Sequence, residues 1–382
     1  MDIQQLKKIF GERYGEPQAT YSSPGRINLI GEHTDYNGGF VLPGAIDKGM
    51  TLALRVTGSD KIRLFSADYD ELSEFGLNES DKPSQGWAKY VFGVVREMSK
   101  RGKQVSGFDA AFYGDVPLGA GLSSSAALES AFAFALNDVF ELGIDKFELA
   151  LIGQATEHNY VGVKCGIMDQ FASLFGKQGH LIRLDCRSLE YQYVPFDPKG
   201  YKLVLIDSRV KHELVNNPYN RRRESCETAA AAIRLRHPEV EFLRDATPDM
   251  LEEARAEINA EDYMRAQFAI GEVRRLLDAC DALVKDDYAT VGAKMYETHD
   301  GLSKLYEVSC EELDFLNDCA KKYEVTGSRI MGGGFGGCTI NLVRDEKHDA
   351  FIAGTLADYK AKFNIDASVY DAVISDGARR ID

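Results

Sequence analysis

The segment PLGAGLSSSAALE, residues 117–129, joins a strand-like run that ends at Asp115-Val116 to a strong helical pattern over 124–142. Glycines let a backbone approach a ligand closely, and the free amides at a helix N-terminus attract anions. The alternative is that Ser123 or Ser124 only caps the helix. We interpret the segment as a phosphate-binding loop formed by Gly119, Ala120, Gly121, Leu122, Ser123, Ser124 and Ser125.

Other phosphate-binding signatures are excluded by their sequence context. No Gly-Lys-Ser or Gly-Lys-Thr occurs, so the chain has no P-loop lysine. A GxGxxG pattern at 332–337 precedes a strand-like run, whereas a dinucleotide fingerprint requires a helix there. The HRD and DFG signatures of protein kinases are absent.

A second dense segment, PGRINLIGEHTDYNGG at 24–39, places Arg26, Glu32, His33 and Asp35 on a turn rich in glycine and asparagine. Side chains that donate and accept several directed hydrogen bonds suit a polyhydroxy ligand. Their density makes a place in the core unexpected, and a solvated hairpin turn at Asn37-Gly38-Gly39 is the alternative.

Composition limits the classes of partner. The chain has 382 residues, 44% of them hydrophobic, and a formal net charge of −15. This acidic balance argues against nucleic acid or an anionic membrane as the main partner. The seven cysteines form no CxxC pair and are expected to be reduced thiols. No apolar run reaches the ~18 residues of a membrane span and the N-terminus lacks a signal-peptide pattern, so we expect a cytoplasmic protein.

Helical and strand-like segments occur in both halves of the chain. Helices are expected at 3–14, 86–100 and 124–142, and in a helix-rich stretch over 218–323. Strands are expected at 46–57, 62–67, 107–114, 178–185, 190–195, 202–208, 325–331, 337–343 and 368–374, with a helix between the last two. This order predicts two α+β domains, at 1–180 and 181–382, and leaves open whether the segment 366–382 returns to the first domain.

Together with MGGGFGGCTINLV at 331–343, the two dense segments resemble the GHMP small-molecule kinases, the superfamily of galactokinase, homoserine kinase, mevalonate kinase and phosphomevalonate kinase. The segment at 24–39 resembles the galactokinase signature in particular. The resemblance implies an N-terminal domain like ribosomal protein S5, a ferredoxin-like α+β C-terminal domain and an active site between them. It also implies ATP and Mg²⁺ as cofactors and galactose as substrate.

The resemblance further implies roles for single residues. Asp169, in CGIMDQF at 165–171, would be the catalytic carboxylate, with Arg26 beside it as a second catalytic group. Mg²⁺ would be bound by Glu157 and Ser125, with Ser123 as the competing serine. Nucleotide contacts are expected at Ser66 and Trp87. Sugar contacts are expected at Glu32, His33, Thr34, Asp35, Gly166, Asp169 and Tyr219.

Each assignment has a structural alternative. Asp169 is also suited to a helix N-terminus, Arg26 to a structural ion pair, and Glu157 to a solvent-facing helical position. For Arg221-Arg222-Arg223 we favour a solvated helix face, and for the 332–337 glycines a tight turn near the nucleotide.

The implied activity is ATP-dependent phosphorylation of the C1 hydroxyl of galactose. The alternatives are a kinase for a related sugar, such as arabinose or a galactosamine derivative, and a sensor that binds galactose and ATP without turnover. Arg26, Asp169 and the unbroken serine run favour the enzyme. No apolar patch or edge strand argues for a dimer, so we expect a monomer.

Overall fold

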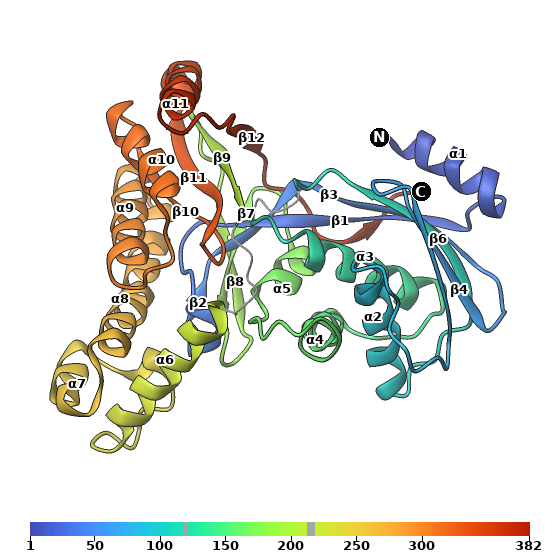
Figure 1. The fold of residues 1–382 in the computed structure, drawn as a ribbon, viewed down its shortest axis with the longest axis horizontal. Helices are drawn as coiled ribbons and strands as arrows, with labels where there is room; N and C mark the ends of the chain where they lie inside the picture. The colour runs from blue at the N-terminus through green and yellow to red at the C-terminus, as the bar shows by residue number, and fades with distance from the viewer. Residues whose placement is uncertain (118–120, 212–217) are drawn as a thin grey trace.

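A six-stranded sheet carries most of the first half of the chain (Figure 1). The computed structural model describes residues 1–117, 121–211 and 218–382. The strand order is β13-β1-β3-β6-β4-β5, antiparallel except for the parallel pair β4 and β6. The strands are β1 (Ala19–Asn28), β3 (Pro43–Val56), β4 (Lys61–Ser66), β5 (Glu71–Gly76), β6 (Phe108–Gly114) and β13 (Arg379–Arg380).

Helices cover both faces of this sheet. On one face lie α2 (Ala88–Lys100), α3 (Ser124–Val139), α4 (Lys146–Thr156) and α5 (Met168–Phe175), and on the other lies α1 (Ile3–Tyr14) (Figure 1). Helix α1 buries one stripe, with Leu6, Phe10 and Tyr14 four residues apart. Helix α3 is apolar on nearly all sides because it packs between β1, β3 and the helices α2, α4 and α5. This packing therefore fixes the first residues of α3, which form the end of the predicted phosphate loop.

The second half is built on a four-stranded antiparallel sheet in the order β10-β11-β9-β12. Its strands are β9 (Tyr201–Lys211), β10 (Gly327–Ile330), β11 (Gly336–Arg344) and β12 (Ser368–Ala372). The helices are α6 (Pro218–Arg234), α7 (Pro248–Glu253), α8 (Ala260–Leu283), α9 (Tyr288–Lys304), α10 (Glu311–Lys322) and α11 (His348–Phe363). A small sheet of β2 (Phe40–Val41), β7 (His180–Asp185) and β8 (Tyr191–Pro195) lies between the two larger sheets (Figure 1).

The end of the chain returns to the first sheet. Strand β12 belongs to the second sheet, but β13 pairs with β1, where Tyr21 lies opposite Arg380 and Ser22 opposite Arg379. The division at 180/181 stays a prediction, with the final strand crossing back over it.

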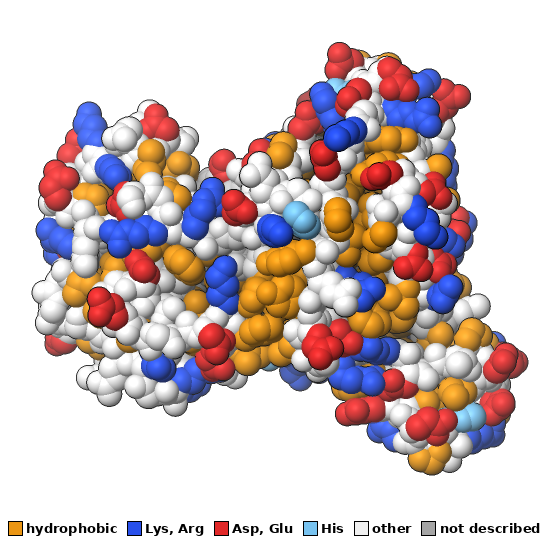
Figure 2. All heavy atoms as spheres, turned by 180° about the vertical axis from the view of Figure 1, so that it is seen from behind, with side chains coloured by type: hydrophobic (Ala, Val, Ile, Leu, Met, Phe, Trp, Pro, Cys, Tyr) orange, Lys and Arg blue, Asp and Glu red, His pale blue; other side chains and the backbone are white. Residues whose placement is uncertain are grey.

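The expected elements are present with ends shifted by a few residues, and four strands were missed: β1, β5 and the two-residue strands β2 and β13. Strand β1 contains Pro24 and Gly25 and carries polar side chains on its buried positions, so its sequence has no period-two apolar pattern. Strand β5 is short and mostly exposed. Among the helices of the described residues, none combines the length and apolar character that a bilayer crossing requires. Acidic and basic side chains are interspersed over the face seen in Figure 2.

Candidate active site

A cavity of about 450 Å³ gathers most of the residues to which the sequence assigned sugar chemistry. Its walls come from the loop after β1, the start of α3, the π-helix η2 (Glu157–Val161), the start of α5, α6 and the glycine loop between β10 and β11. The lining residues are Arg26, Glu32, His33, Asp35, Tyr90, Ser125, Glu157, Gly162, Val163, Cys165, Gly166, Met168, Asp169, Tyr219, Gly332 and Gly333.

Arg26 and Asp169 form a two-pronged ion pair at this cavity. Arg26 Nε donates to Oδ1 of Asp169 and Nη2 donates to Oδ2, both over 2.9 Å. The Ser123 hydroxyl donates to the same Oδ2. Burial opposes the charge on Arg26, but Asp169 and then Glu32 raise its pKa overall. Asp169 lies in the first turn of α5, so the ion-pair and helix-terminus alternatives both describe the geometry, and neither removes the carboxylate from the cavity.

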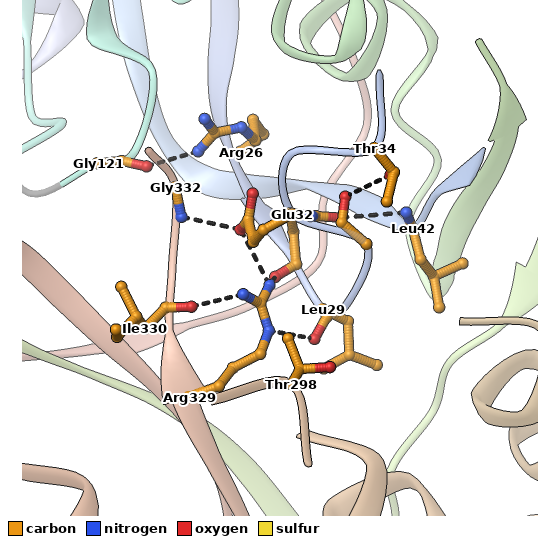
Figure 3. Close-up of polar contacts among 12 residues, drawn as sticks. Arg26, Leu29, Glu32, Thr34, Leu42, Gly121, Thr298, Arg329, Ile330 and Gly332 are labelled. Atoms are coloured by element: carbon orange, nitrogen blue, oxygen red, sulfur yellow. Dashed lines mark hydrogen bonds and ion pairs between the residues drawn. The ribbon is translucent and has the colours of Figure 1, made fainter. Parts of the chain in front are cut away.

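Glu32 is bound by a residue from the second half of the chain that the sequence analysis did not identify. Arg329 on β10 is fully buried and donates through Nη2 to Oε1 of Glu32 over 3.0 Å (Figure 3). The Gly332 amide donates to the same oxygen over 2.8 Å. Within the described residues Oε2 has no hydrogen-bond partner, so Oε2 is the oxygen that remains for a ligand. The only sequence signal for Arg329 is a charged residue in a strand-like run next to the glycine loop.

Arg329 also fixes the start of the loop that follows β1. Its Nε donates to the carbonyl of Leu29 over 2.8 Å and its Nη2 to the carbonyl of Asn28 (Figure 3). Arg26, Glu32 and His33 are at most 4% exposed. The solvated hairpin turn is therefore wrong, and so is the expectation that these charged side chains are badly placed for a core. Arg329 from the second half of the chain compensates the cost of burying Glu32, and Asp169 compensates that of burying Arg26.

Asp35 is placed by a close approach to Gly166. A Cβ on Gly166 would lie 1.8 Å from Oδ2 of Asp35, so only glycine leaves room for this carboxylate. Asp35 Oδ1 accepts a 2.9 Å hydrogen bond from the amide of Tyr36. Burial raises the pKa of Asp35 to about 7, and the charges of Asp169 and Glu32 act in the same direction.

Thr34 and Ser66 line neither this cavity nor the one that adjoins it. Thr34 is buried, and its hydroxyl lies 2.9 Å from the carbonyl of Gly31 and 2.5 Å from that of Phe40, which closes the loop. Ser66 ends β4 and is fully buried, whereas its neighbours Asp68 and Tyr69 line a second cavity.

This second cavity, of about 390 Å³, adjoins the first and contains Trp87 and two of the loop serines. Tyr90 and Ser125 line both cavities, so they lie where a sugar side and a nucleotide side would meet. Its lining is Met50, Asp68, Tyr69, Trp87, Tyr90, Phe112, Gly114, Val116, Ser124, Ser125 and Leu128. Asp68, Tyr69 and Tyr90 were not among the predicted contacts.

Ser123 and Ser125 of the phosphate loop interact with different carboxylates. The Ser125 hydroxyl acts on Glu157, where it lowers the pKa of the carboxyl against the effect of burial, while the Ser123 hydroxyl donates to Asp169. Burial raises the pKa of Glu157 to about 7. Glu157 is 6% exposed, which excludes the solvent-facing alternative. Among the other loop residues, Gly121 and Leu122 contact Arg26 through their carbonyls, and Gly119 and Ala120 lie outside the described residues.

The basic run on α6 is only partly a solvated face. Arg221 is exposed, but Arg222 is buried and donates to the carbonyls of Tyr306 and Glu307. The expectation is therefore wrong for Arg222. Gly332 to Gly337 form a turn with positive φ at four glycines, and Gly332 and Gly333 line the first cavity. The predicted tight turn is present, while its expected place near the nucleotide stays a prediction.

Comparison with known proteins identifies the family. Three family models match: the galactokinase galactose-binding signature over residues 8–56, the GHMP kinases N terminal domain over 89–177 and the GHMP kinases C terminal over 279–361. A galactokinase of Thermotoga petrophila is 40% identical over 94% of this chain and 99% of its own. One from Fusobacterium nucleatum is 39% identical over 99% and 98%. The chain belongs to the galactokinase family.

The structural comparison agrees. The galactokinase of Lactococcus lactis, solved as a complex with galactose, superposes with a TM-score of 0.95 at 34% identity, over 99% of this chain and 100% of that one. The mevalonate kinase of Methanococcus jannaschii shares the fold, with a TM-score of 0.68 at 17% identity. The predicted two-domain α+β architecture of the GHMP kinases is thereby confirmed.

Proposed function

We propose that the chain transfers the γ-phosphoryl group of ATP to the C1 hydroxyl of galactose. The observation that carries this proposal is the Arg26–Asp169 pair, which lies at the sugar cavity beside the loop serines. Membership of the galactokinase family and similarity to a galactose-bound galactokinase support the choice of sugar.

In this proposal the chemistry is a single displacement. Asp169 accepts the proton of the C1 hydroxyl while that oxygen forms a bond to the γ-phosphorus, and the bond from the γ-phosphorus to the β,γ-bridging oxygen breaks to release ADP. Arg26 orients Asp169 through its two parallel hydrogen bonds and adds positive charge beside the transferring group. Glu32, His33, Asp35 and Tyr219 bind the sugar hydroxyls.

A magnesium ion fits the junction of the two cavities. Ser125 and Glu157 supply hard oxygen donors there, and a cation would favour the charged form of the buried Glu157. The described residues contain no group of three or more metal-binding side chains. Mg²⁺ bound mainly through nucleotide phosphates needs only one or two protein ligands. When bound, it neutralises charge on the phosphates.

The test is an ADP-release assay with MgATP and each of galactose, glucose, arabinose, galactosamine and N-acetylgalactosamine. We expect turnover with galactose well above the others, and a loss of about 10²–10⁴-fold in kcat for Asp169→Asn. Preference for another sugar would assign the chain to a related sugar kinase. Galactose binding without ADP release would make it a sensor, and wild-type turnover in the variant would remove Asp169 as the base.

The chain's occurrence as a cytoplasmic monomer stays a prediction. Sedimentation of the purified protein tests the monomer.

A further inference from the structure

A chain of buried hydroxyl groups runs from the sugar cavity into the helices of the second half. The Tyr36 hydroxyl lies 2.7 Å from Nδ1 of His33 and 2.8 Å from the Tyr306 hydroxyl. The Tyr306 hydroxyl lies 3.2 Å from Sγ of Cys226 on α6. We call Tyr36, Tyr306 and Cys226 the tyrosine relay. Of these four residues, only His33 lines the cavity.

The hydrogen bonds that join His33 to the tyrosine relay can run in either of two directions, and the acceptor atoms distinguish these directions. In one direction the Cys226 thiol donates to Tyr306, Tyr306 to Tyr36, and Tyr36 to Nδ1 of His33. Every acceptor is then an oxygen or a ring nitrogen. In the reverse direction the last acceptor is the sulfur of Cys226, which is a weak acceptor, and the thiol proton takes part in none of these hydrogen bonds. Burial raises the pKa of Cys226 to about 11, so the thiol keeps its proton at neutral pH.

The ring of His33 is held in place by its neighbours. The rings of Tyr306, Tyr219 and Tyr36 lie with centroids 4.8, 5.4 and 5.8 Å from that of His33. Arg222 fixes the position of Tyr306 through a 2.8 Å hydrogen bond from its Nε to the Tyr306 carbonyl. Burial, followed by the charge of Arg222, lowers the pKa of His33 to about 3. The ring is therefore neutral, with a single proton to place.

We propose that the tyrosine relay holds His33 in the tautomer with its proton on Nε2, so that His33 donates a hydrogen bond to a hydroxyl oxygen of the sugar. Within the described residues the buried Nε2 makes no hydrogen bond of standard length and angle, although the nearby backbone of Gly333 acts to raise the His33 pKa against the effect of burial. A buried donor without an acceptor is costly, and a bound ligand removes that cost. Tyr36 and Tyr306 are then positioning residues, since they act through His33. This inference rests on the proposed function, because it takes the occupant of the cavity to be a sugar.

The test compares Tyr36→Phe with a matched control, Tyr359→Phe. Both tyrosines are buried and hydrogen-bonded, but the Tyr359 hydroxyl donates to the backbone carbonyl of Ser208, away from the cavity. The wild type and both variants are labelled with ¹⁵N-histidine. The ring nitrogens are observed by NMR at neutral pH, and the His33 signals are identified by their loss in His33→Gln. KM and kcat for galactose are measured in parallel.

We expect the wild type and Tyr359→Phe to show a protonated Nε2 and an unprotonated Nδ1. Tyr36→Phe should show mixed tautomers and a KM for galactose raised roughly 3- to 10-fold, with kcat nearly unchanged, as for one lost hydrogen bond. Tyr306→Phe should change the same two readouts to a smaller extent, and it replaces Tyr36→Phe if that variant does not fold.

A wild-type ring protonated on Nδ1 would overturn the proposal, as would a Tyr36→Phe variant with the KM of the wild type. The NMR measurement needs no turnover. If the protein failed to phosphorylate galactose, the proposed function would be refuted. The measured tautomer of His33 would still show whether the tyrosine relay positions its proton.

Discussion

At the scale of single residues, the site is a set of buried charges whose partners come from distant parts of the chain. Glu32 and Arg329 are 297 positions apart, and Arg26 and Asp169 are 143 apart. The sequence marks Arg26, Glu32 and Asp169 as chemically unusual. It carries no local signal for which cation meets which carboxylate, and this is why Arg329 was missed and why the site was expected to be solvated.

Gly166→Ala should displace the Asp35 carboxylate, since the new Cβ would lie 1.8 Å from Oδ2. Losing one hydrogen bond to a charged group predicts a KM for galactose raised about 10- to 100-fold, with the KM for ATP little changed. Gly11→Ala is the control, because its Cβ would meet nothing within 4 Å. An unaltered galactose KM in Gly166→Ala would remove Asp35 from the sugar site.

Asp35 should also make stability depend on pH. The unfolded chain releases this proton near pH 3.8, whereas the folded state holds it up to about pH 7. The folded state binds more protons in that window, so the free energy of unfolding should fall as pH rises from about 4 to about 7.

Asp35→Asn should flatten part of that fall. Thermal unfolding without ligands at about pH 5 and about pH 8 measures it. The exposed Asp318→Asn is the control, because it should leave the slope unchanged. Equal slopes in the wild type and Asp35→Asn would contradict the raised pKa.

At the scale of elements, α3 and the π-helix η2 bring Ser125 and Glu157 to one point. Helix α3 was predictable because its apolar pattern is long and regular. The π-helix was not, since its five residues depend on packing against α2 and α4. Strand β1 was missed because its buried positions carry polar side chains that only tertiary contacts satisfy. Regular elements thus follow from local sequence, whereas the irregular segments that carry the chemistry do not.

The three loop serines should give different phenotypes. Ser125→Ala and Glu157→Gln should both raise the Mg²⁺ concentration needed for half-maximal activity and weaken MgATP binding, because the first removes an oxygen donor and the second removes the negative charge of the carboxylate. Ser123→Ala should instead lower kcat, since Ser123 donates to Asp169. Ser124→Ala is the internal comparison. Mg²⁺ titrations with kinetics and calorimetry distinguish these outcomes, and a Ser123→Ala variant with the larger shift in Mg²⁺ requirement would reverse the assignment.

At the scale of the whole molecule, the last residues tie the chain's end to the C-terminal end of α5 and to the first sheet. The amides of Gly377, Ala378 and Ile381 donate to the carbonyls of Gly176, Ser173 and Thr20 over 2.8–3.0 Å. Deleting 377–382 should lower the free energy of unfolding by at least about 3 kcal/mol, at about 1 kcal/mol for each of these three hydrogen bonds, because the pairing of β13 with β1 is lost as well.

Arg379→Ser is the control for this deletion, because it changes an exposed side chain and keeps the backbone pairing. Calorimetry of the two variants measures the difference. A truncated protein as stable as the control would show that this return contributes nothing.

In the proposed reaction this site places phosphate on C1 of galactose. The most direct measurement is a phosphorus NMR spectrum of the product formed from galactose and MgATP, in which coupling to the anomeric proton reports the position of attachment. We expect a single sugar phosphate coupled to that proton, formed by the wild type and almost absent with Asp169→Asn. Phosphate attached elsewhere on the sugar, or inorganic phosphate released without a sugar product, would contradict it.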